Sequence, residues 1–213
     1  MSIEGAVDLL ARELAGLNHV PAIGLGSGRT AAKVLRELGT RLNRMGIRPY
    51  GVPSSSQIKL ELSGLFLITE PVFDRLDMVI DGADQISSEN GYIIKGGGGA
   101  LTRERIIWEM ATTRHVFVSK DKLVRRLTFP LPVEIIPFGY TLVKHRLADL
   151  NLRHELRRDQ RGYPVITENG NYIVDVYYQE DSNLREVYES IRRLPGVLDV
   201  GLFIYDVNIH IIE

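Results

Sequence analysis

The sequence predicts an α/β protein with a parallel sheet covered by helices on both faces and a smaller α+β unit. Over residues 1–128, short apolar runs alternate with amphipathic stretches, which is typical of strands joined by helical crossovers. Near Pro130 the pattern changes to closely spaced β-rich runs. A chain of 213 residues is long enough for one large domain and one small one.

The first half of the chain is expected to open with a helix over residues 3–17, where apolar side chains recur at helical spacing. A strand at residues 21–24 leads into a glycine-rich turn, here called the 24–30 loop, and then into a helix that runs to about Met45. Strands are expected at residues 49–52, 65–68, 78–80 and 115–118, with helices from about Gln57 and from Ala100. Residues 92–94 form a further short apolar run within the loop that joins the strand at 78–80 to the second of these helices.

The second half is expected to form the α+β unit. Residues 168–171, with the sequence ENGN, lie between two β-rich runs and predict a hairpin turn. The strands are expected at residues 133–136, 152–156, 165–167, 172–177, 197–204 and 207–212, and the helices at residues 141–148 and 183–194.

Charge and composition exclude several classes of protein. The chain has 26 basic and 27 acidic residues, whereas a nucleic-acid-binding protein needs a basic excess or stripe. The most basic run, residues 153–161, carries its own acids and is interpreted as a solvated face. Without cysteine, without an apolar run of ~20 residues and without a signal-peptide pattern, we expect a cytoplasmic protein that contacts no membrane.

The densest cluster of reactive side chains lies in residues 77–110. Asp81 is expected at the carboxyl end of a strand, where open α/β sheets bind ligands. Asp84, Lys95, four consecutive glycines at residues 96–99 and Glu104 follow. Taken singly, the aspartates fit turn residues and Glu104 fits a helix N-terminus. Their combination favours a site in which glycine backbone N–H groups approach a ligand closely.

The 24–30 loop predicts a second ligand contact. A strand, a glycine-rich turn and a helix N-terminus present free N–H groups to an anion. The spacing Gly24-x-Gly26-x-Gly28 is not that of a dinucleotide fingerprint, so a single phosphate held with Ser27, Thr30 and Arg29 fits better. The serines at residues 54–56 are equally compatible with a helix cap and with a ligand contact.

A metal site is not expected. The five histidines are scattered, and no two have the spacing of metal ligands, so acid and base work falls to carboxylates. Asp81, Asp84 and Glu104 together could hold a divalent ion, but Lys95 would compete for the same carboxylates.

Several motifs, in order over nearly the whole chain, carry a resemblance to a known family: GLGSGRTA, VPSSSQ, DGADQ, KGGGGALTRE, LPVEIIPF, TENGNYIVDV and PGVLDVGLF. The chain resembles ribose-5-phosphate isomerases of the A type. The resemblance implies interconversion of D-ribose 5-phosphate and D-ribulose 5-phosphate without metal or organic cofactor, by a homodimer or homotetramer. It also implies a Rossmann-like domain, 1–128 plus 199–213, and an inserted ferredoxin-like α+β domain, 129–198, involved in oligomerisation.

The resemblance also implies roles for individual residues. Glu104 matches the catalytic base, which moves a proton between C2 and C1 through a cis-enediolate. Lys95 would stabilise the enediolate oxygens. Asp81 would move protons between O1 and O2 and Asp84 would orient hydroxyls or assist ring opening, although these two roles could be exchanged. The substrate-binding positions are Ser27, Gly28, Arg29, Thr30, Gly82, Ala83, Gly96, Gly97, Gly98 and Lys122.

Three departures from the family pattern stand out: Arg29 in place of a small hydroxyl residue, Gln85 in place of a glutamate, and SKDK at residues 119–122. We expect Arg29 to supply the cation for the phosphate, because the lysine typical of the family's first helix is absent. A sugar-phosphate sensor is the alternative, but a sensor has no use for a positioned base. A third interpretation, a nucleotide-dependent oxidoreductase, requires a dinucleotide-binding fingerprint that the sequence does not contain.

Overall fold

The computed structural model describes residues 2–179 and 182–212, which divide into two compact units. Within the described chain, the first unit comprises residues 2–83, 103–123 and 206–212. The second comprises residues 84–102 and 124–205, apart from the two undescribed positions. Each unit has its own hydrophobic core.

The first unit is built on a six-stranded sheet in which every pair of neighbours is parallel. Strands buried on both faces read as continuous apolar runs, as β1 does with all four of its residues buried. The strands, in their order across the sheet, are β14 (Asn208–Ile212), β7 (Ala111–Ser119), β4 (Leu76–Asp81), β1 (Ala22–Leu25), β2 (Tyr50–Pro53) and β3 (Leu67–Ile68).

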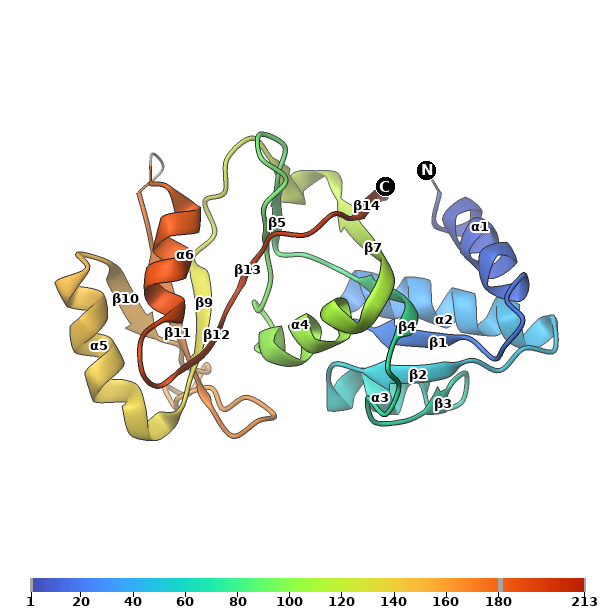
Figure 1. The fold of residues 1–213 in the computed structure, drawn as a ribbon, viewed down its shortest axis with the longest axis horizontal. Helices are drawn as coiled ribbons and strands as arrows, with labels where there is room; N and C mark the ends of the chain where they lie inside the picture. Colours follow the sequence, from blue (N-terminus) through green and yellow to red (C-terminus); the bar gives the residue numbers. More distant parts are fainter. Residues whose placement is uncertain (1, 180–181, 213) are drawn as a thin grey trace. The chain divides into compact units, whose positions relative to one another are not determined.

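Helices cover both faces of this sheet. The crossover through α2 runs from β1 to β2, and that through α4 runs from β4 the opposite way across the sheet to β7, so right-handed connections place the two helices on opposite faces. Figure 1 shows α1 beside α2. Ser55 caps α3 by accepting a hydrogen bond from the Ile58 N–H, so the expected helix cap is present at this serine. The helices are α1 (Ile3–Ala15), α2 (Arg29–Arg44), α3 (Ser56–Leu62) and α4 (Leu101–Met110).

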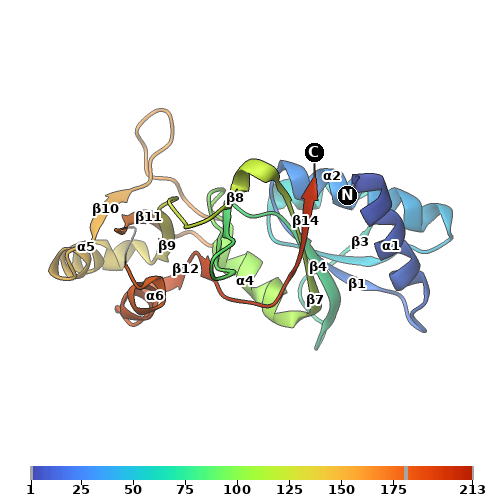
Figure 2. The ribbon, with the colours of Figure 1, turned by 90° about the horizontal axis from the view of Figure 1, so that it is seen from above.

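The second unit contains an antiparallel sheet in the order β10-β11-β9-β12. Chain order β-α-β-β-α-β with this strand order is the ferredoxin-like topology that was expected. Figure 2 shows α5 and α6 beside the sheet, and their apolar side chains complete the core of the unit. The elements are β9 (Leu131–Ile135), α5 (Tyr140–Asp149), β10 (Arg153–Leu156), β11 (Tyr172–Tyr177), α6 (Leu184–Arg192) and β12 (Val197–Val200).

A smaller four-stranded sheet has the order β13-β6-β5-β8, in which β6 pairs antiparallel with both β13 and β5. β12 and β13 replace the single strand expected at residues 197–204. The break falls at Gly201, where a Cβ would lie 2.2 Å from the Lys95 carbonyl oxygen. The strands are β5 (Gln85–Ser87), β6 (Ile93–Ile94), β8 (Leu123–Val124) and β13 (Leu202–Phe203), and two 3₁₀ turns are η1 (Lys120–Lys122) and η2 (Pro137–Gly139).

The α/β class with a central parallel sheet is confirmed. The prediction of a strand at residues 165–167 is wrong: Ile166 forms only an isolated bridge to Tyr172, and Pro164, which forms another to Arg158, has no N–H with which to extend a ladder. The second compact unit also contains residues 84–102, which were expected in the larger domain. A compact unit need not fold independently, so the domain boundaries 1–128 plus 199–213 and 129–198 remain a prediction.

Candidate active site

The 24–30 loop connects β1 to α2 in the first unit. Gly26 donates its N–H to the Ile80 carbonyl of the neighbouring strand at 2.9 Å. Gly28 precedes the helix with φ +99°, a conformation that favours glycine. Arg29 is exposed at the first position of α2, and Thr30 is half-buried beside it. The loop therefore presents a hydroxyl, a guanidinium and a helix N-terminus, which suit a phosphate.

Asp81 ends β4 and is fully buried. Its Oδ1 accepts a hydrogen bond from the Gly82 N–H at 2.7 Å, and its Oδ2 accepts one from the Trp108 indole N–H at 2.8 Å. Gly26 lies against it so closely that a Cβ there would be 2.1 Å from the Asp81 Cγ. The contact from Trp108, the only tryptophan in the chain, was missed from the sequence; its place four residues after Glu104 was the available signal.

Glu104 lies in the first turn of α4 and is 4% exposed. The Ser27 hydroxyl donates a hydrogen bond to its Oε1 at 2.6 Å. The carboxylate expected to act as a base and the loop expected to bind phosphate are 77 positions apart in sequence, and this bond brings them together. A carboxylate at this place can exchange a proton with a group that is bound by the 24–30 loop.

Lys122, which rested on the family resemblance alone, lies in the 3₁₀ turn after β7. Its Nζ donates a hydrogen bond to the Ala83 carbonyl oxygen at 2.6 Å. The lysine is thereby attached to residues 81–83, the other predicted substrate segment of the first unit. Its single positive charge adds to that of Arg29 in the same unit.

Asp84 and Gly97 meet in the second unit. The Gly97 N–H donates a hydrogen bond to Asp84 Oδ2 at 2.7 Å. A Cβ on Gly97 would lie 2.4 Å from Asp84 Oδ1, so the contact depends on glycine. Asp84 is half-buried whereas Asp81 is fully buried, so of the two carboxylates Asp84 is the more accessible to a ligand.

Residues 95–99, here called the glycine loop, follow β6. Lys95 is 3% exposed, and its backbone N–H donates to the Gly201 carbonyl at 2.9 Å. Gly96 has φ +98°, and a Cβ there would lie 3.0 Å from the Leu101 Cβ. Gly97 and Gly98 are exposed, so their backbone is the part of the loop that a ligand can reach.

The Gln85 side chain has a structural task. Its Oε1 accepts hydrogen bonds from the backbone N–H groups of Thr128 and Phe129, both at 2.8 Å, and its Nε2 donates to the Thr128 hydroxyl at 3.0 Å. A glutamate would accept the same backbone bonds but could not donate the third. This departure from the family pattern therefore serves to attach β5 to the segment that precedes β9.

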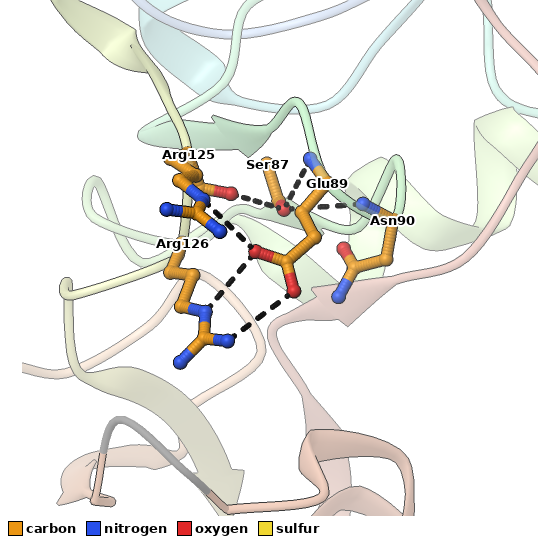
Figure 3. A network of polar contacts seen from close by, with 5 residues as sticks. All are labelled: Ser87, Glu89, Asn90, Arg125 and Arg126. Atoms are coloured by element: carbon orange, nitrogen blue, oxygen red, sulfur yellow. Dashed lines mark hydrogen bonds and ion pairs between the residues drawn. The ribbon is translucent and has the colours of Figure 1, made fainter.

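The turn between β5 and β6 is tied to the segment after β8, as Figure 3 shows. The Ser87 hydroxyl donates to the Arg125 carbonyl at 3.0 Å, and Glu89 accepts from the Arg126 Nε at 3.1 Å. The hydrogen bond from Arg126 lowers the pKa of the exposed Glu89 carboxyl. These contacts fix the turn that leads into Lys95.

Glu134 on β9 was not singled out in the sequence, yet its carboxylate is fully buried in the second unit. Its Oε2 accepts a hydrogen bond from Thr102, in the first turn of α4. Its Oε1 accepts bonds from the Thr167 hydroxyl at 2.7 Å, from Asn169 at 3.0 Å and from Asn171 at 2.9 Å. The expected hairpin turn thus covers a buried charge, whose burial requires such partners.

Residues 2–179 and 182–212 contain no group of three or more histidine and carboxylate side chains that could hold a metal ion. Over the same residues, no helix has the length and apolar character that a membrane crossing needs.

Comparison with known proteins finds one family. Residues 50–213 match the family described as Ribose 5-phosphate isomerase A (phosphoriboisomerase A). Ribose-5-phosphate isomerase A of Methanococcus aeolicus is 37% identical over 186 residues, which cover 85% of this chain and 79% of that protein. Ribose-5-phosphate isomerase A of Thermomicrobium roseum is 38% identical over 209 residues, covering 96% of this chain and 88% of that protein.

Solved structures agree. Ribose 5-phosphate isomerase A from Methanocaldococcus jannaschii has a TM-score of 0.83 at 33% identity, covering 94% of this chain and 90% of that one. A D-ribose-5-phosphate isomerase in complex with phospho-erythronic acid has a TM-score of 0.82 at 35% identity, covering 98% and 93%. With a family match over most of its length and relatives of this similarity, the chain belongs to the ribose 5-phosphate isomerase A family.

Proposed function

We propose that this chain interconverts D-ribose 5-phosphate and D-ribulose 5-phosphate through a cis-enediolate. The family, the names of the relatives and the sugar-acid phosphate bound by one solved relative support this substrate class. The single observation that carries the proposal is the hydrogen bond from Ser27 to Glu104, because it joins the phosphate-binding loop to a buried carboxylate.

Glu104 is the proposed base. It removes the proton from C2 of the open-chain aldose and returns it to C1, so that C1 is reduced while C2 is oxidised. The exchange balances within the substrate and calls for no external oxidant or reductant. Burial places the carboxylate away from bulk water, where a positioned base contributes most to proton transfer.

Charge that develops on the two enediolate oxygens needs donors. We assign this to Lys95 and to the N–H groups of the glycine loop, since preorganised donors are usually the largest single contribution to such reactions. Asp84 is the proposed partner of the substrate hydroxyls, because it is the more accessible aspartate. Asp81, whose two oxygens accept hydrogen bonds from Gly82 and Trp108, is proposed to move the hydroxyl proton between O2 and O1, which completes the proton balance of the isomerisation.

The phosphate is proposed to bind at Ser27, Gly28, Arg29 and Thr30, with Lys122 as a second cation. The helix N-terminus and the Arg29 guanidinium supply complementary charge. The further residues proposed to bind substrate are Gly82, Ala83, Gly96, Gly97 and Gly98.

A homodimer or homotetramer in the cytoplasm is proposed for the working enzyme. The resemblance to the family supports the oligomer, and the absence of cysteine from the sequence is compatible with a reducing compartment. Sedimentation at several protein concentrations distinguishes a dimer, a tetramer and a monomer.

The function is tested by following ribulose 5-phosphate formation from ribose 5-phosphate, with and without EDTA, in the wild type and in Glu104→Gln. We expect turnover that EDTA does not change and a fall in kcat by ~10² or more in the variant. Glu109→Gln is the matched control, since Glu109 is exposed on the same helix, and its kcat should stay at the wild-type value. A folded wild type that binds the sugar phosphate without turnover would favour a sensor instead.

A further inference from the structure

The guanidinium of Arg157 is directed at the glycine loop. Arg157 directly follows β10, and its Nη1 donates hydrogen bonds to the carbonyl oxygens of Gly96, at 2.7 Å, and Gly97, at 3.0 Å. All of these residues belong to the second unit. A charged donor to a carbonyl makes a stronger hydrogen bond than a neutral one.

The same guanidinium is fixed from its other side by Asp175 on β11. Its Nε donates to Asp175 Oδ2 at 2.8 Å, and its Nη2 donates to Asp175 Oδ1, so the pair is bidentate. The two side chains are only 15% and 16% exposed. The planar guanidinium suits this arrangement, because its Nε–Nη2 edge binds the carboxylate while Nη1 stays directed at the loop.

Holding the two carbonyls fixes the orientation of two peptide groups. In a trans peptide the N–H points away from the preceding carbonyl. The carbonyl of Gly96 bonds to Arg157 while the N–H of Gly97, in the same peptide group, bonds to Asp84 at 2.7 Å. The carbonyl of Gly97 bonds to Arg157, so the N–H of the exposed Gly98 points away from the guanidinium.

We propose that Arg157, anchored by Asp175, is a positioning residue that presents the Gly98 N–H and the Asp84 carboxylate to the substrate. The inference rests on the proposed isomerase function and deepens it. Arg157 acts through the loop and does not itself contact the substrate. Its positive charge also polarises the two peptide groups, which makes their N–H groups better donors.

Arg157→Gln tests this inference, with Arg153→Gln as the matched control. Arg153 is the first residue of β10, the strand that Arg157 follows, but its side chain is 71% exposed and bonds Glu155 instead of the loop. We expect kcat of Arg157→Gln to fall by ~10-fold or more, since misplaced donors lose transition-state stabilisation. KM should change much less, because the phosphate is bound by the 24–30 loop.

Amide hydrogen exchange supplies a second measurement that does not depend on activity. Peptides that contain residues 96–99 should exchange faster in Arg157→Gln and at the wild-type rate in Arg153→Gln. Unchanged kcat in a folded Arg157→Gln overturns the inference, as does unchanged exchange in the loop. If Arg157→Gln does not fold, Asp175→Asn replaces it with the same expectations and the same contradicting results. A wild type without turnover would refute the proposed function instead, while the exchange rates still test the anchor.

Discussion

The 24–30 loop and the glycine loop are both rich in glycine, but different parts of the chain hold them. In the first unit, Gly26 packs against Asp81 at the end of the adjacent parallel strand, and Gly28 starts the helix that follows directly. In the second unit, the carbonyls of the glycine loop bond to Arg157, about 60 positions away in sequence. Its first N–H bonds to Gly201, still further along the chain.

The difference separates local from distant support. A loop between consecutive strand and helix takes its shape from elements that lie beside it in sequence, and its glycines are needed where a neighbouring strand leaves no room. The glycine loop takes its shape from polar side chains on other strands. We therefore expect the 24–30 loop to be disrupted by substitutions that add side-chain volume. The glycine loop should be disrupted by substitutions that remove its distant polar partners.

The largest expected effect is on the free energy of unfolding, when one glycine in each loop is replaced by alanine. In Gly26→Ala the added Cβ would lie 2.1 Å from the Asp81 Cγ, and Asp81 is fully buried and bonded to Trp108. Overpacking at such a position costs ~3 kcal/mol in the free energy of unfolding. In Gly98→Ala the Cβ meets nothing within 4 Å, and we expect a change within ~0.5 kcal/mol. Urea unfolding of both variants measures the difference, and equal losses would contradict it.

The next prediction concerns substrate affinity. Arg29→Ser removes the guanidinium at the start of α2, and the loss of a charged hydrogen bond to the phosphate should raise KM by ~10-fold or more with little change in kcat. Arg44→Ser, at the last position of the same helix, is the control and should leave KM unchanged. This result would assign binding to the 24–30 loop, whereas Arg157 is expected to affect kcat. An unchanged KM in Arg29→Ser excludes Arg29 as the phosphate cation.

Sequence patterns predicted the first of these regions far better than the second. The succession of β1, the 24–30 loop and α2 is written in consecutive residues, and so are Asp81 at a strand end and Glu104 in a helical first turn. Apolar periodicity and glycine spacing report such local arrangements.

The contacts that support the glycine loop could not be predicted from comparable sequence patterns. Arg157 lies within a charged run that was interpreted as a solvated face, and that interpretation is wrong for this residue, whose side chain is 15% exposed. The hydrogen bonds of Trp108 and Glu134 were also not predicted, because a bond between side chains far apart in sequence produces no periodic pattern. Only the fold shows which distant polar groups converge.

The smallest predicted effect distinguishes the two units by pH. In the first unit, His115 on β7 and His210 on β14 lie with Nδ1 and Nε2 3.1 Å apart, and the His210 ring stacks on Phe117. Burial, and next the charge of His115, lowers the pKa of His210 from 6.5 to about 4, and burial also lowers the pKa of His115. Between these pH values the unfolded chain binds more protons than the folded one, so stability falls as the pH falls from 6.5 to about 4.

A shift of this size corresponds to ~3 kcal/mol, and solvent screening at the half-buried His210 reduces the expected loss to ~1 kcal/mol. Urea unfolding at several pH values should show this loss in the wild type and a flatter profile in His210→Gln. Amide exchange, corrected for its intrinsic pH dependence, locates the effect. β7 and β14 should lose protection on acidification before β9 and β11 do, because the histidine pair joins strands of the first unit only. Equal loss in both units, or a profile that His210→Gln leaves unchanged, would show that other groups set the response to pH.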